Sequence, residues 1–434
     1  MAELNQTHDP NRRSWVEAAN SPDTDFPIQN LPFGVFRRPG GAPRGGVAIG
    51  DHIVDLAGCA QAGLFTGVPE TAAEAAAGPK LNPLMSLDPA TISALRARLS
   101  DLLRTDGPQD LRSRAEELLV PAADVPMELP AAIGDYTDFS CSTHHMMRMG
   151  GGAVRPVFLQ LPVGYHGRSS SLRVSGADVV RPLGQVAAKD GPPVFGPEPQ
   201  LDFELEFAAF VGRGNPLGQA IPIGEAEDHI FGYCLLNDWS ARAIQMFEMA
   251  LGPFLGKSFL TTISPWVVTR EAMAPFRTAA FARPEGDPPI PGYLFDEADR
   301  QEGGLEVRME AFLSTEAMRW RGDEPQRIVA TNFRYIYWTL AQMLAHHASG
   351  GCDMRPGDLF ASGTVSGPED EAKACLMEAN ERGTRALPLP GGESRLWLED
   401  GDEVRIRGRA ERQGFVPIGF GPCDGRVMAA ETAG

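Results

Sequence analysis

Residues 201–212, LDFELEFAAFVG, decide the fold that we expect. Side chains alternate between the two faces of a β-strand, so the apolar residues of the first half would share one face. The carboxylates would share the other face, namely those of Asp202, Glu204 and Glu206. The second half is apolar on both faces, which is typical of a strand inside a sheet. A solvent-facing strand is the alternative, but the sequence favours a buried strand whose carboxylates need partners.

Short apolar runs separated by turns surround this strand. The 434 residues include 48 glycines and 37 prolines with no Gly-X-Y period, which indicates many turns and short strands. Helical patterns are fewer and cover residues 89–102, 110–119 and 332–348. Asp88 can cap the first of these, and Thr331 or Asn332 would open the third. We therefore predict an α+β protein that is mostly β.

A proline-rich connector divides the chain. Residues 121–130 read PAADVPMELP, and proline blocks both helix and strand pairing, so this segment should be extended. We place the domain boundary near residue 127. Residues 1–25 are polar and are predicted to form a flexible tail. Residues 26–127 would form a small β domain with a helical connector, and residues 128–434 a larger β-rich domain.

Charge and cysteine content exclude several classes of function. The chain has 39 basic and 57 acidic residues, a net charge of −18, which repels the phosphates of nucleic acids and anionic lipids. We therefore expect neither a nucleic-acid nor a membrane partner. The six cysteines are scattered singly, which favours a reducing cytoplasm. No secretion signal and no membrane-spanning apolar run is present.

Oxygen-bearing side chains are the candidates for a metal site. Besides the glutamates of the strand, Asp238 ends the apolar run YCLLND and Asp138 lies in GDYTDF. Oxygen ligands without thiolates select hard cations such as Mg²⁺ or Ca²⁺. Each aspartate also has a structural interpretation, since Asp238 could cap the following helix and Asp138 could close an Asx turn.

A histidine and a further carboxylate could supply acid–base chemistry. His145 follows Asp138 closely and could be a base near a metal, or a histidine that only packs. Glu378 interrupts the apolar run in ACLMEAN, so it could orient an imidazole or face solvent on a strand. The glycine-rich segments LPVGYHGRSS, GPFLGKSF and ASGTVSG lack the spacing of nucleotide-binding loops, so nucleotide binding is not predicted.

Ten motifs follow one another between about residue 26 and residue 426. They are FPIQNLPFGVF, GVAIG, GDYTDF, LPVGYHGR, LDFELE, LNDWSAR, GPFLGKSF, TTISPWVV, RPGDLFASGT and LEDGDEV. Together these motifs resemble the fumarylacetoacetase family. The resemblance implies a small N-terminal β-barrel domain. It also implies a C-terminal catalytic domain of mixed β-roll or sandwich form, and a homodimer.

The resemblance implies a role for each matched residue. The implied metal ligands are Asp138, Glu204, Glu206 and Asp238, with Lys257 and Thr261 in a motif that the family associates with metal or product oxygens. The implied catalytic set comprises His145 as the base, Glu378 as its orienting carboxylate, and Arg242, Gln245 and Lys257 as oxyanion contacts. The implied substrate contacts are Tyr165 and Thr364, and Ser140 and Met249 occupy further substrate positions.

The implied reaction is metal-dependent hydrolysis of a carbon–carbon bond in a β-diketone. The substrate would be fumarylacetoacetate or a related acyl-acetoacetate or acylpyruvate, in tyrosine, phenylalanine or other aromatic catabolism. The two diketone oxygens would chelate Mg²⁺ or Ca²⁺, with Mn²⁺ as a further candidate. The alternative is a decarboxylase, isomerase or hydratase that acts on a 2-oxo acid at the same metal site. The retained pair His145 and Glu378 favours hydrolysis, because it can activate water.

The chain departs from the family in the substrate pocket. Ser140 and Met249 stand where the family usually has tyrosines, and the segment after His145 is shorter than in the family. No residue matches the family's carboxylate-binding arginine, and the sequence leaves Arg148 and Arg155 open as replacements. Because bidentate arginine contacts are among the stronger polar interactions, we expect an altered or broadened substrate preference.

Overall fold

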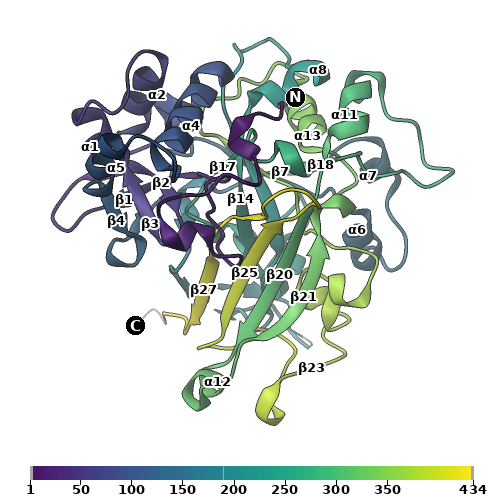
Figure 1. The fold of residues 1–434 in the computed structure, drawn as a ribbon. Coiled ribbons are helices and arrows are strands. Elements are labelled where there is room, and N and C mark those ends of the chain that lie inside the picture. Colours follow the sequence, from purple (N-terminus) through teal and green to yellow (C-terminus); the bar gives the residue numbers. More distant parts are fainter. Residues whose placement is uncertain (1–2, 189, 432–434) are drawn as a thin grey trace.

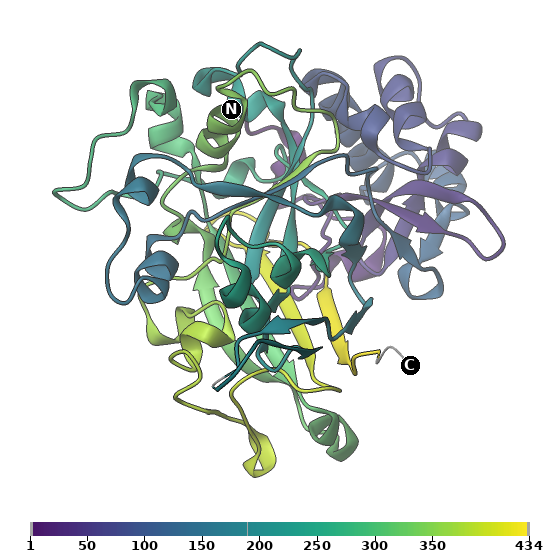
Figure 2. The ribbon, with the colours of Figure 1, turned by 180° about the vertical axis from the view of Figure 1, so that it is seen from behind.

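The computed structural model describes residues 3–188 and 190–431. The N-terminal part, purple to blue in Figure 1, forms a lobe with a small sheet and most of the longer helices. The rest of the chain forms a larger, β-rich part, and Figure 2 shows the same division from behind. Among the described residues, no helix is long and apolar enough to cross a membrane. Helices and strands both contribute to each part, so the protein is a mixed α and β structure.

The N-terminal sheet has five antiparallel strands in the order β4-β3-β2-β1-β5. Their bounds are Phe33–Arg37 for β1, Pro43–Ile49 for β2, His52–Asp55 for β3, Leu119–Pro121 for β4 and Met127–Glu128 for β5. No backbone ladder joins the end strands β4 and β5 within the described part of the chain. The sheet is therefore open, and the closed small β-barrel that we expected is not formed. The predicted boundary at residue 127 falls inside β5.

Five helices accompany this sheet. They are α1 (Leu56–Gln61), α2 (Val68–Ala76), α3 (Asn82–Met85), α4 (Pro89–Leu103) and α5 (Gln109–Glu116). Of these helices, α1 and α2 contact strands of the sheet. The start of α4 is as predicted, because the Asp88 side chain accepts from the Thr91 N–H and Pro89 occupies the first turn. Helix α5 ends earlier than predicted, since Leu119 begins β4.

Residues 3–25 are packed against α4, so the predicted flexible tail is wrong for the described part of this segment. Thr7, Ser14 and Val16 are buried. The guanidinium of Arg96, itself buried on α4, donates to the Thr7 hydroxyl at 3.2 Å and to the carbonyls of residues 29 and 30. The polar composition of this segment indicated disorder, but its polar groups are used for caps and turns.

Two larger sheets build the C-terminal part. The eight-stranded sheet runs β7-β6-β22-β13-β14-β16-β8, and β17 pairs with β14. Its strands are β6 (Tyr136–Phe139), β7 (Gly164–Gly167), β8 (Leu172–Val174), β13 (Leu205–Val211), β14 (Ile230–Asp238), β16 (Thr261–Ile263), β17 (Val268–Thr269) and β22 (Leu359–Ala361). The six-stranded sheet runs β21-β20-β25-β27-β9, and β26 pairs with β25. Its strands are β9 (Asp178–Val180), β20 (Val307–Ser314), β21 (Gln326–Asn332), β25 (Glu403–Ala410), β26 (Ile418–Gly419) and β27 (Cys423–Met428).

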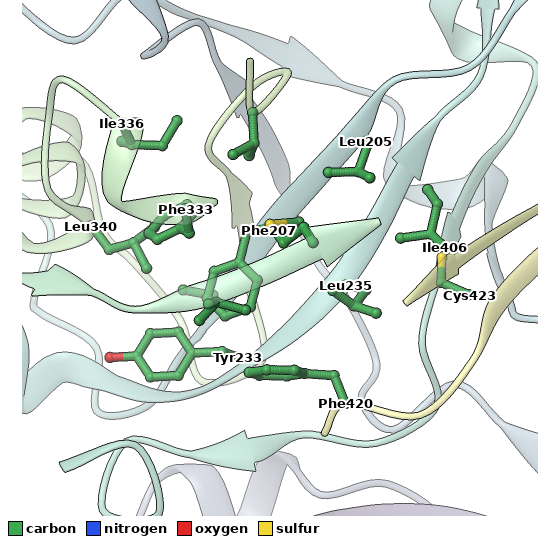
Figure 3. Packing of buried hydrophobic residues seen from close by; sticks show 14 of the residues in the cluster. Leu205, Phe207, Tyr233, Leu235, Phe333, Ile336, Leu340, Ile406, Phe420 and Cys423 are labelled. Carbon is green, nitrogen blue, oxygen red and sulfur yellow. The ribbon is translucent and has the colours of Figure 1, made fainter. Parts of the chain in front are cut away.

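The main core lies between these two sheets. Phe207 of β13 stacks on Tyr233 of β14, with ring centroids 5.6 Å apart, and meets Phe420 edge-on at 5.1 Å. Figure 3 shows this group together with Leu235, and Ile406 from the opposite sheet. Every residue of β13 is buried, which confirms the prediction that the second half of residues 201–212 crosses the interior. The first half is interrupted, because β12 (Leu201–Asp202) pairs with β15 (Ser240–Ala241) instead.

Short elements complete the fold. The remaining helices are α6 (Thr143–Met149), α7 (Pro156–Gln160), α8 (Ile223–Ala226), α9 (Arg242–Glu248), α10 (Leu255–Ser258), α11 (Glu297–Glu302), α12 (Glu316–Arg321), α13 (Leu340–Ala348) and α14 (Leu376–Ala379). The remaining strand pairs are β10 (Leu183–Val186) with β11 (Val194–Pro197), β18 (Arg277–Thr278) with β19 (Gly304–Leu305), and β23 (Leu387–Pro388) with β24 (Ser394–Arg395).

The helix expected over residues 332–348 begins later than predicted. Asn332 ends β21, where it pairs with Arg308 of β20, and its side chain caps the short 3₁₀ helix Phe333–Tyr335. This helix does not continue, because the backbone is extended again at Ile336. Helix α13 starts instead after Thr339, whose side chain accepts from the Gln342 N–H in a reciprocal capping box. The apolar side chains of this segment are nevertheless buried, namely those of Phe333, Ile336, Tyr337, Leu340 and Leu344.

Candidate metal and catalytic site

Four acidic side chains meet where strands of the eight-stranded sheet begin or end. They are Asp138 on β6, Glu204 just before β13, Glu206 on β13 and Asp238 at the end of β14. All four are buried, and one carboxylate oxygen of each lies within 4.8 Å of the others. Asp238 does not cap the next helix, whose N-cap is Ala241. The structure thus brings together the four carboxylates that the resemblance implies as metal ligands.

Asp202, the third acidic residue of the opening strand, does not join this cluster. Its carboxylate accepts from the backbone N–H groups of Leu376 and Met377, at 2.7 and 3.0 Å, and from Arg242. The break between β12 and β13 separates it from Glu204 and Glu206. The expectation that three carboxylates share one face is therefore wrong for Asp202, which instead anchors the start of α14.

The cluster carries more negative charge than its neighbours neutralise. Burial, followed by repulsion between the carboxylates, raises the pKa of Asp138 and of Glu206 well above the ordinary range. Both oxygens of Glu206 and Oδ1 of Asp138 are buried and have no hydrogen-bond partner. Unpaired buried carboxylate oxygens are costly, so this donor set fits a hard divalent cation.

Lys257 on α10 lies among the carboxylates as a counter-charge. Its Nζ donates to Glu204 Oε2 and to Asp238 Oδ2, both at 2.6 Å. Burial opposes the charge on this ammonium, but Asp238 and Glu204 raise the pKa of Lys257 above its ordinary value. An ammonium has no lone pair, so Lys257 holds the ligands and is not one itself. Thr261 likewise donates its hydroxyl to Asp238 Oδ1, at 3.2 Å.

Arg242 joins the cluster to its surroundings. Its Nη1 lies 2.6 Å from Glu204 Oε1, and its Nη2 lies 2.8 Å from Asp202 Oδ2. Burial alone would raise the pKa of Glu204, but Lys257 and Arg242 hold it below the ordinary range. Gln245, one turn later on α9, accepts from Arg242 through Oε1 at 3.3 Å, which leaves its amide NH₂ free to donate.

A histidine–carboxylate pair lies beside the cluster. His145 Nδ1 is 2.6 Å from Glu378 Oε1, and Ser366 donates to the same oxygen at 2.6 Å. Burial opposes ionisation of Glu378, but the charge and hydrogen bond of His145, with Ser366 and Arg148, lower its pKa to about 2. An ionised carboxylate only accepts, so Nδ1 donates, and in the neutral form of the imidazole Nε2 is left as an acceptor. Glu378 is buried on α14 and does not face solvent on a strand.

The backbone places this pair close to the cluster. Glu204 forms a β-bridge with Cys375, the residue that caps α14, and α14 carries Glu378. Cys375 also groups with His145 and Glu378, since one polar atom of each lies within 4.8 Å of the others. A potential base and a cation-binding cluster therefore share one buried site.

Of the four predicted substrate contacts, Tyr165 directly adjoins the carboxylate cluster. The Tyr165 hydroxyl on β7 donates to Asp238 Oδ2 at 3.2 Å, and a cavity of about 220 Å³ is lined by Tyr165, Asp238, Lys257 and Phe254. Thr364 is buried beyond the end of β22. Ser140 is half-buried after β6, whereas Met249 is exposed at the end of α9, and both lie outside the lining of this cavity.

Family comparisons account for nearly the whole chain. Residues 29–130 match the model of the fumarylacetoacetase N-terminal domain, and residues 135–428 match that of the fumarylacetoacetate hydrolase C-terminal domain. The chain belongs to the fumarylacetoacetate hydrolase family. The resemblance drawn from its motifs is confirmed.

Curated relatives span the same length. The fumarylacetoacetase of Bos taurus is 47% identical over 433 residues, covering 96% of this chain and 99% of that protein. The fumarylacetoacetase of Oryza sativa subsp. japonica is 46% identical over 433 residues, covering 96% and 97%. A solved fumarylacetoacetate hydrolase from the psychrophilic Exiguobacterium antarcticum is 16% identical with a TM-score of 0.51, covering 92% of this chain and 99% of that one. This last likeness shows a shared fold.

The two arginines that the sequence left open as replacements for the family's substrate arginine differ in their contacts. Arg148 is engaged in the protein, because its guanidinium contacts Glu378 Oε2 and the Gly367 carbonyl, each at 2.8 Å. Arg155 is exposed just before α7, and no ion pair or side-chain hydrogen bond engages it within the described residues. Of the two, only Arg155 has no side-chain partner among the described residues.

Sequence reasoning missed three residues that support this site. Asp202 was assigned to the wrong group, and Ser366 and the role of Arg148 were not predicted. The signal for Arg148 was its position one helical turn after His145, since residues at that spacing share a helix face. Ser366 lies in ASGTVSG, which drew attention only for its glycines.

Proposed function

We propose that this chain hydrolyses fumarylacetoacetate to fumarate and acetoacetate, the activity that its curated relatives are named for. One observation carries the proposal: a buried four-carboxylate cluster beside a histidine whose Nδ1 is held by an ionised glutamate. The near-complete coverage of the curated fumarylacetoacetases supports it. The reaction belongs to tyrosine and phenylalanine catabolism.

The base follows from the hydrogen bonds of the imidazole. Glu378 occupies Nδ1 of His145, so Nε2 accepts the proton of a water molecule as that water attacks the carbonyl. The carbon–carbon bond then breaks, and its electron pair leaves with the acetoacetate carbon, which takes up a proton. The same imidazole can return the proton, since Glu378 remains ionised and stabilises the imidazolium form.

Cationic and amide groups stabilise the negative charge that develops. Lys257 and the free amide NH₂ of Gln245 are positioned near the carboxylate cluster. Arg242 acts mainly by holding Glu204 and Asp202, because its guanidinium contacts both. Loss of a single oxyanion donor typically lowers the rate by about 10²- to 10³-fold.

The cluster of Asp138, Glu204, Glu206 and Asp238 would hold the divalent cation, and we propose Mg²⁺ or Ca²⁺, with Mn²⁺ as a further candidate. When bound, such a cation supplies a Lewis acid that polarises the diketone and stabilises the departing enolate. Lys257 and Thr261 keep Asp238 oriented through their hydrogen bonds.

We also infer the organisation of the molecule from its fold. The two domains would meet after β5, near the gap between the two family matches. The two facing sheets of the C-terminal part support the mixed β-roll or sandwich that the resemblance implies. The free state of all six cysteines agrees with the proposed cytoplasmic location.

We propose a homodimer, for which an exposed apolar surface is the candidate interface. This surface is formed by α9, α10, the loop between them and the hairpin β10–β11, which contact one another. Its exposed side chains include Val194, Phe195, Met246, Phe247, Leu251 and Phe254. Contiguous exposed apolar groups of this kind commonly mark protein interfaces.

The test is turnover of fumarylacetoacetate by the purified protein with Mg²⁺, followed by NMR detection of fumarate and acetoacetate. We expect His145→Ala to lower kcat by at least about 10²-fold while the protein stays folded. The control is His52→Ala, which changes a histidine of the N-terminal sheet that bonds only to Asp51. Absence of turnover in the unchanged protein, or full activity of His145→Ala, would refute the proposal.

A further inference from the structure

Arg148 completes the shell around Glu378. It lies one turn after His145 on α6, so both side chains leave the same face of the helix and reach α14. Its Nη1 donates to Glu378 Oε2 at 2.8 Å. Its Nη2 donates to the Gly367 carbonyl at 2.8 Å, in the segment that leads to α14.

The two oxygens of Glu378 therefore have different tasks. Oε1 accepts from His145 and Ser366, while Oε2 accepts from Arg148. The terminal torsion of a glutamate is broad and roughly two-fold, so the carboxylate plane is fixed only when both oxygens are held. The Glu378 side chain is fully buried, and without Arg148 its Oε2 would be left without this partner.

We propose that Arg148 is a positioning residue for the His145–Glu378 pair, and that it acts by fixing the plane and the charge of Glu378. The inference rests on the proposed hydrolysis, because it concerns the pair that activates water. Both amino groups of the Arg148 guanidinium donate to groups of the protein. Arg148 therefore holds Glu378 and does not take the place of the family's substrate-binding arginine, which the sequence had left open. Arg148 touches no reacting atom.

A double-mutant cycle separates this role from a purely structural one. Arg148→Met removes the guanidinium but keeps an unbranched side chain, and we expect a 10- to 100-fold lower kcat, an estimate based on the loss of a charged hydrogen bond, with KM changed less than about three-fold. In the Glu378→Gln background the same change should alter kcat less than about three-fold. An unchanged kcat in Arg148→Met, or a full loss in both backgrounds, overturns the inference.

The control is Arg382→Met, because Arg382 donates to the Met149 carbonyl of the same helix without contacting Glu378. We expect it to leave kcat within about two-fold of the unchanged protein, as for a surface substitution. If Arg148→Met does not fold, the cycle is run with Arg148→Lys, which keeps the charge but cannot bind Oε2 and the Gly367 carbonyl together. A loss that persists in the Glu378→Gln background then overturns the inference.

A second measurement does not depend on turnover. The proton on His145 Nδ1 should give a downfield NMR signal, assigned by its loss in His145→Ala. We expect this signal in the unchanged protein and in Arg382→Met, and its broadening or loss in Arg148→Met. An unaltered signal in Arg148→Met contradicts the positioning role, even if fumarylacetoacetate is not the substrate. Failure of the proposed function appears separately, as absence of turnover in the unchanged protein.

Discussion

Glu206 is the residue that most clearly calls for a cation. Both of its oxygens are buried and unpartnered, and burial with repulsion from Asp138 and Asp238 raises its pKa. In the chain without a cation this carboxylate therefore opposes folding, and a bound cation reverses the effect. The free energy of unfolding should thus depend on metal through this one side chain.

We predict that Glu206→Gln keeps or raises the unfolding temperature in EDTA and abolishes its increase with Mg²⁺ or Ca²⁺. The change removes an unpaired charge but keeps the shape of the side chain. Scanning calorimetry with chelator and with added cation measures both effects. The matched control is Glu225→Gln, at an exposed position on α8, which should respond to the cation like the unchanged protein. A normal metal response in Glu206→Gln would contradict the assignment.

Ser140 is the residue that tests the substrate pocket. It stands where the family usually has a tyrosine, and it is half-buried after β6, close to Asp138. We predict that Ser140→Tyr lowers KM for fumarylacetoacetate by about 2- to 10-fold, the worth of one hydrogen bond. Ser140→Phe adds the ring without the hydroxyl and should not show this gain. Equal KM values for the two variants would argue that the hydroxyl makes no contact.

The start of helix α13 depends on a buried aspartate of helix α11. Asp299 on α11 accepts from the Thr339 hydroxyl at 2.9 and 3.0 Å, and Thr339 in turn caps α13. Burial, only partly offset by Thr339 and by Arg277, raises the pKa of Asp299 from its ordinary 3.8 to about 6. A raised pKa means that the folded state binds this proton more tightly than the unfolded chain does.

We predict that this group makes the protein less stable as pH rises from about 4 to about 6. Its stabilising contribution is complete below the unfolded pKa and is lost through the folded pKa, by an amount on the order of 3 kcal/mol. Asp299→Asn cannot titrate, so its stability relative to the unchanged protein should increase over this window. Urea unfolding in saturating Mg²⁺ measures the difference, and parallel curves for the two proteins would contradict the prediction.

Local sequence patterns were sufficient to predict some helices and strands. The cap Asp88, followed by Pro89, identified α4, since both signals are local. The alternation in residues 201–212 correctly placed Glu204 and Glu206 together inside the protein. It misplaced Asp202, because the pairing of β12 with β15 breaks the strand, and that pairing involves residues distant in the sequence. The predicted start at Asn332 holds only for the short 3₁₀ helix Phe333–Tyr335, because the chain is extended at Ile336 and α13 begins after Thr339.

At the scale of the whole molecule, the site depends on contacts that no local pattern contains. His145 and Glu378 lie 233 residues apart, and only the folded sheet brings α6 and α14 together. Sequence reasoning from single residues left both with alternative interpretations, and the family motifs selected between them. The N-terminal segment shows the opposite case, because its composition indicated disorder while Arg96 binds it to α4. In both cases the structure depends on contacts between residues that are far apart in the sequence.

The exposed apolar surface leads to a prediction for assembly. Leu251 is fully exposed between α9 and α10, and Phe195 is exposed on the neighbouring hairpin. We predict that the 46.7 kDa chain sediments as a dimer and that the double change Leu251→Asp with Phe195→Asp yields the monomer. Leu217→Asp alters another exposed leucine, which lies outside this surface, and should leave the dimer intact. A monomeric unchanged protein, or a dimeric double variant, would refute this interface.

We propose that the cluster of Asp138, Glu204, Glu206 and Asp238 holds the cation on which hydrolysis depends. The most direct measurement is turnover of fumarylacetoacetate by chelator-treated protein while Mg²⁺ or Ca²⁺ is added back. We predict no turnover without a cation and full recovery when one ion is bound per chain. Full turnover in the chelated protein, or no turnover after the cation is restored, would show that hydrolysis does not depend on a cation in this cluster.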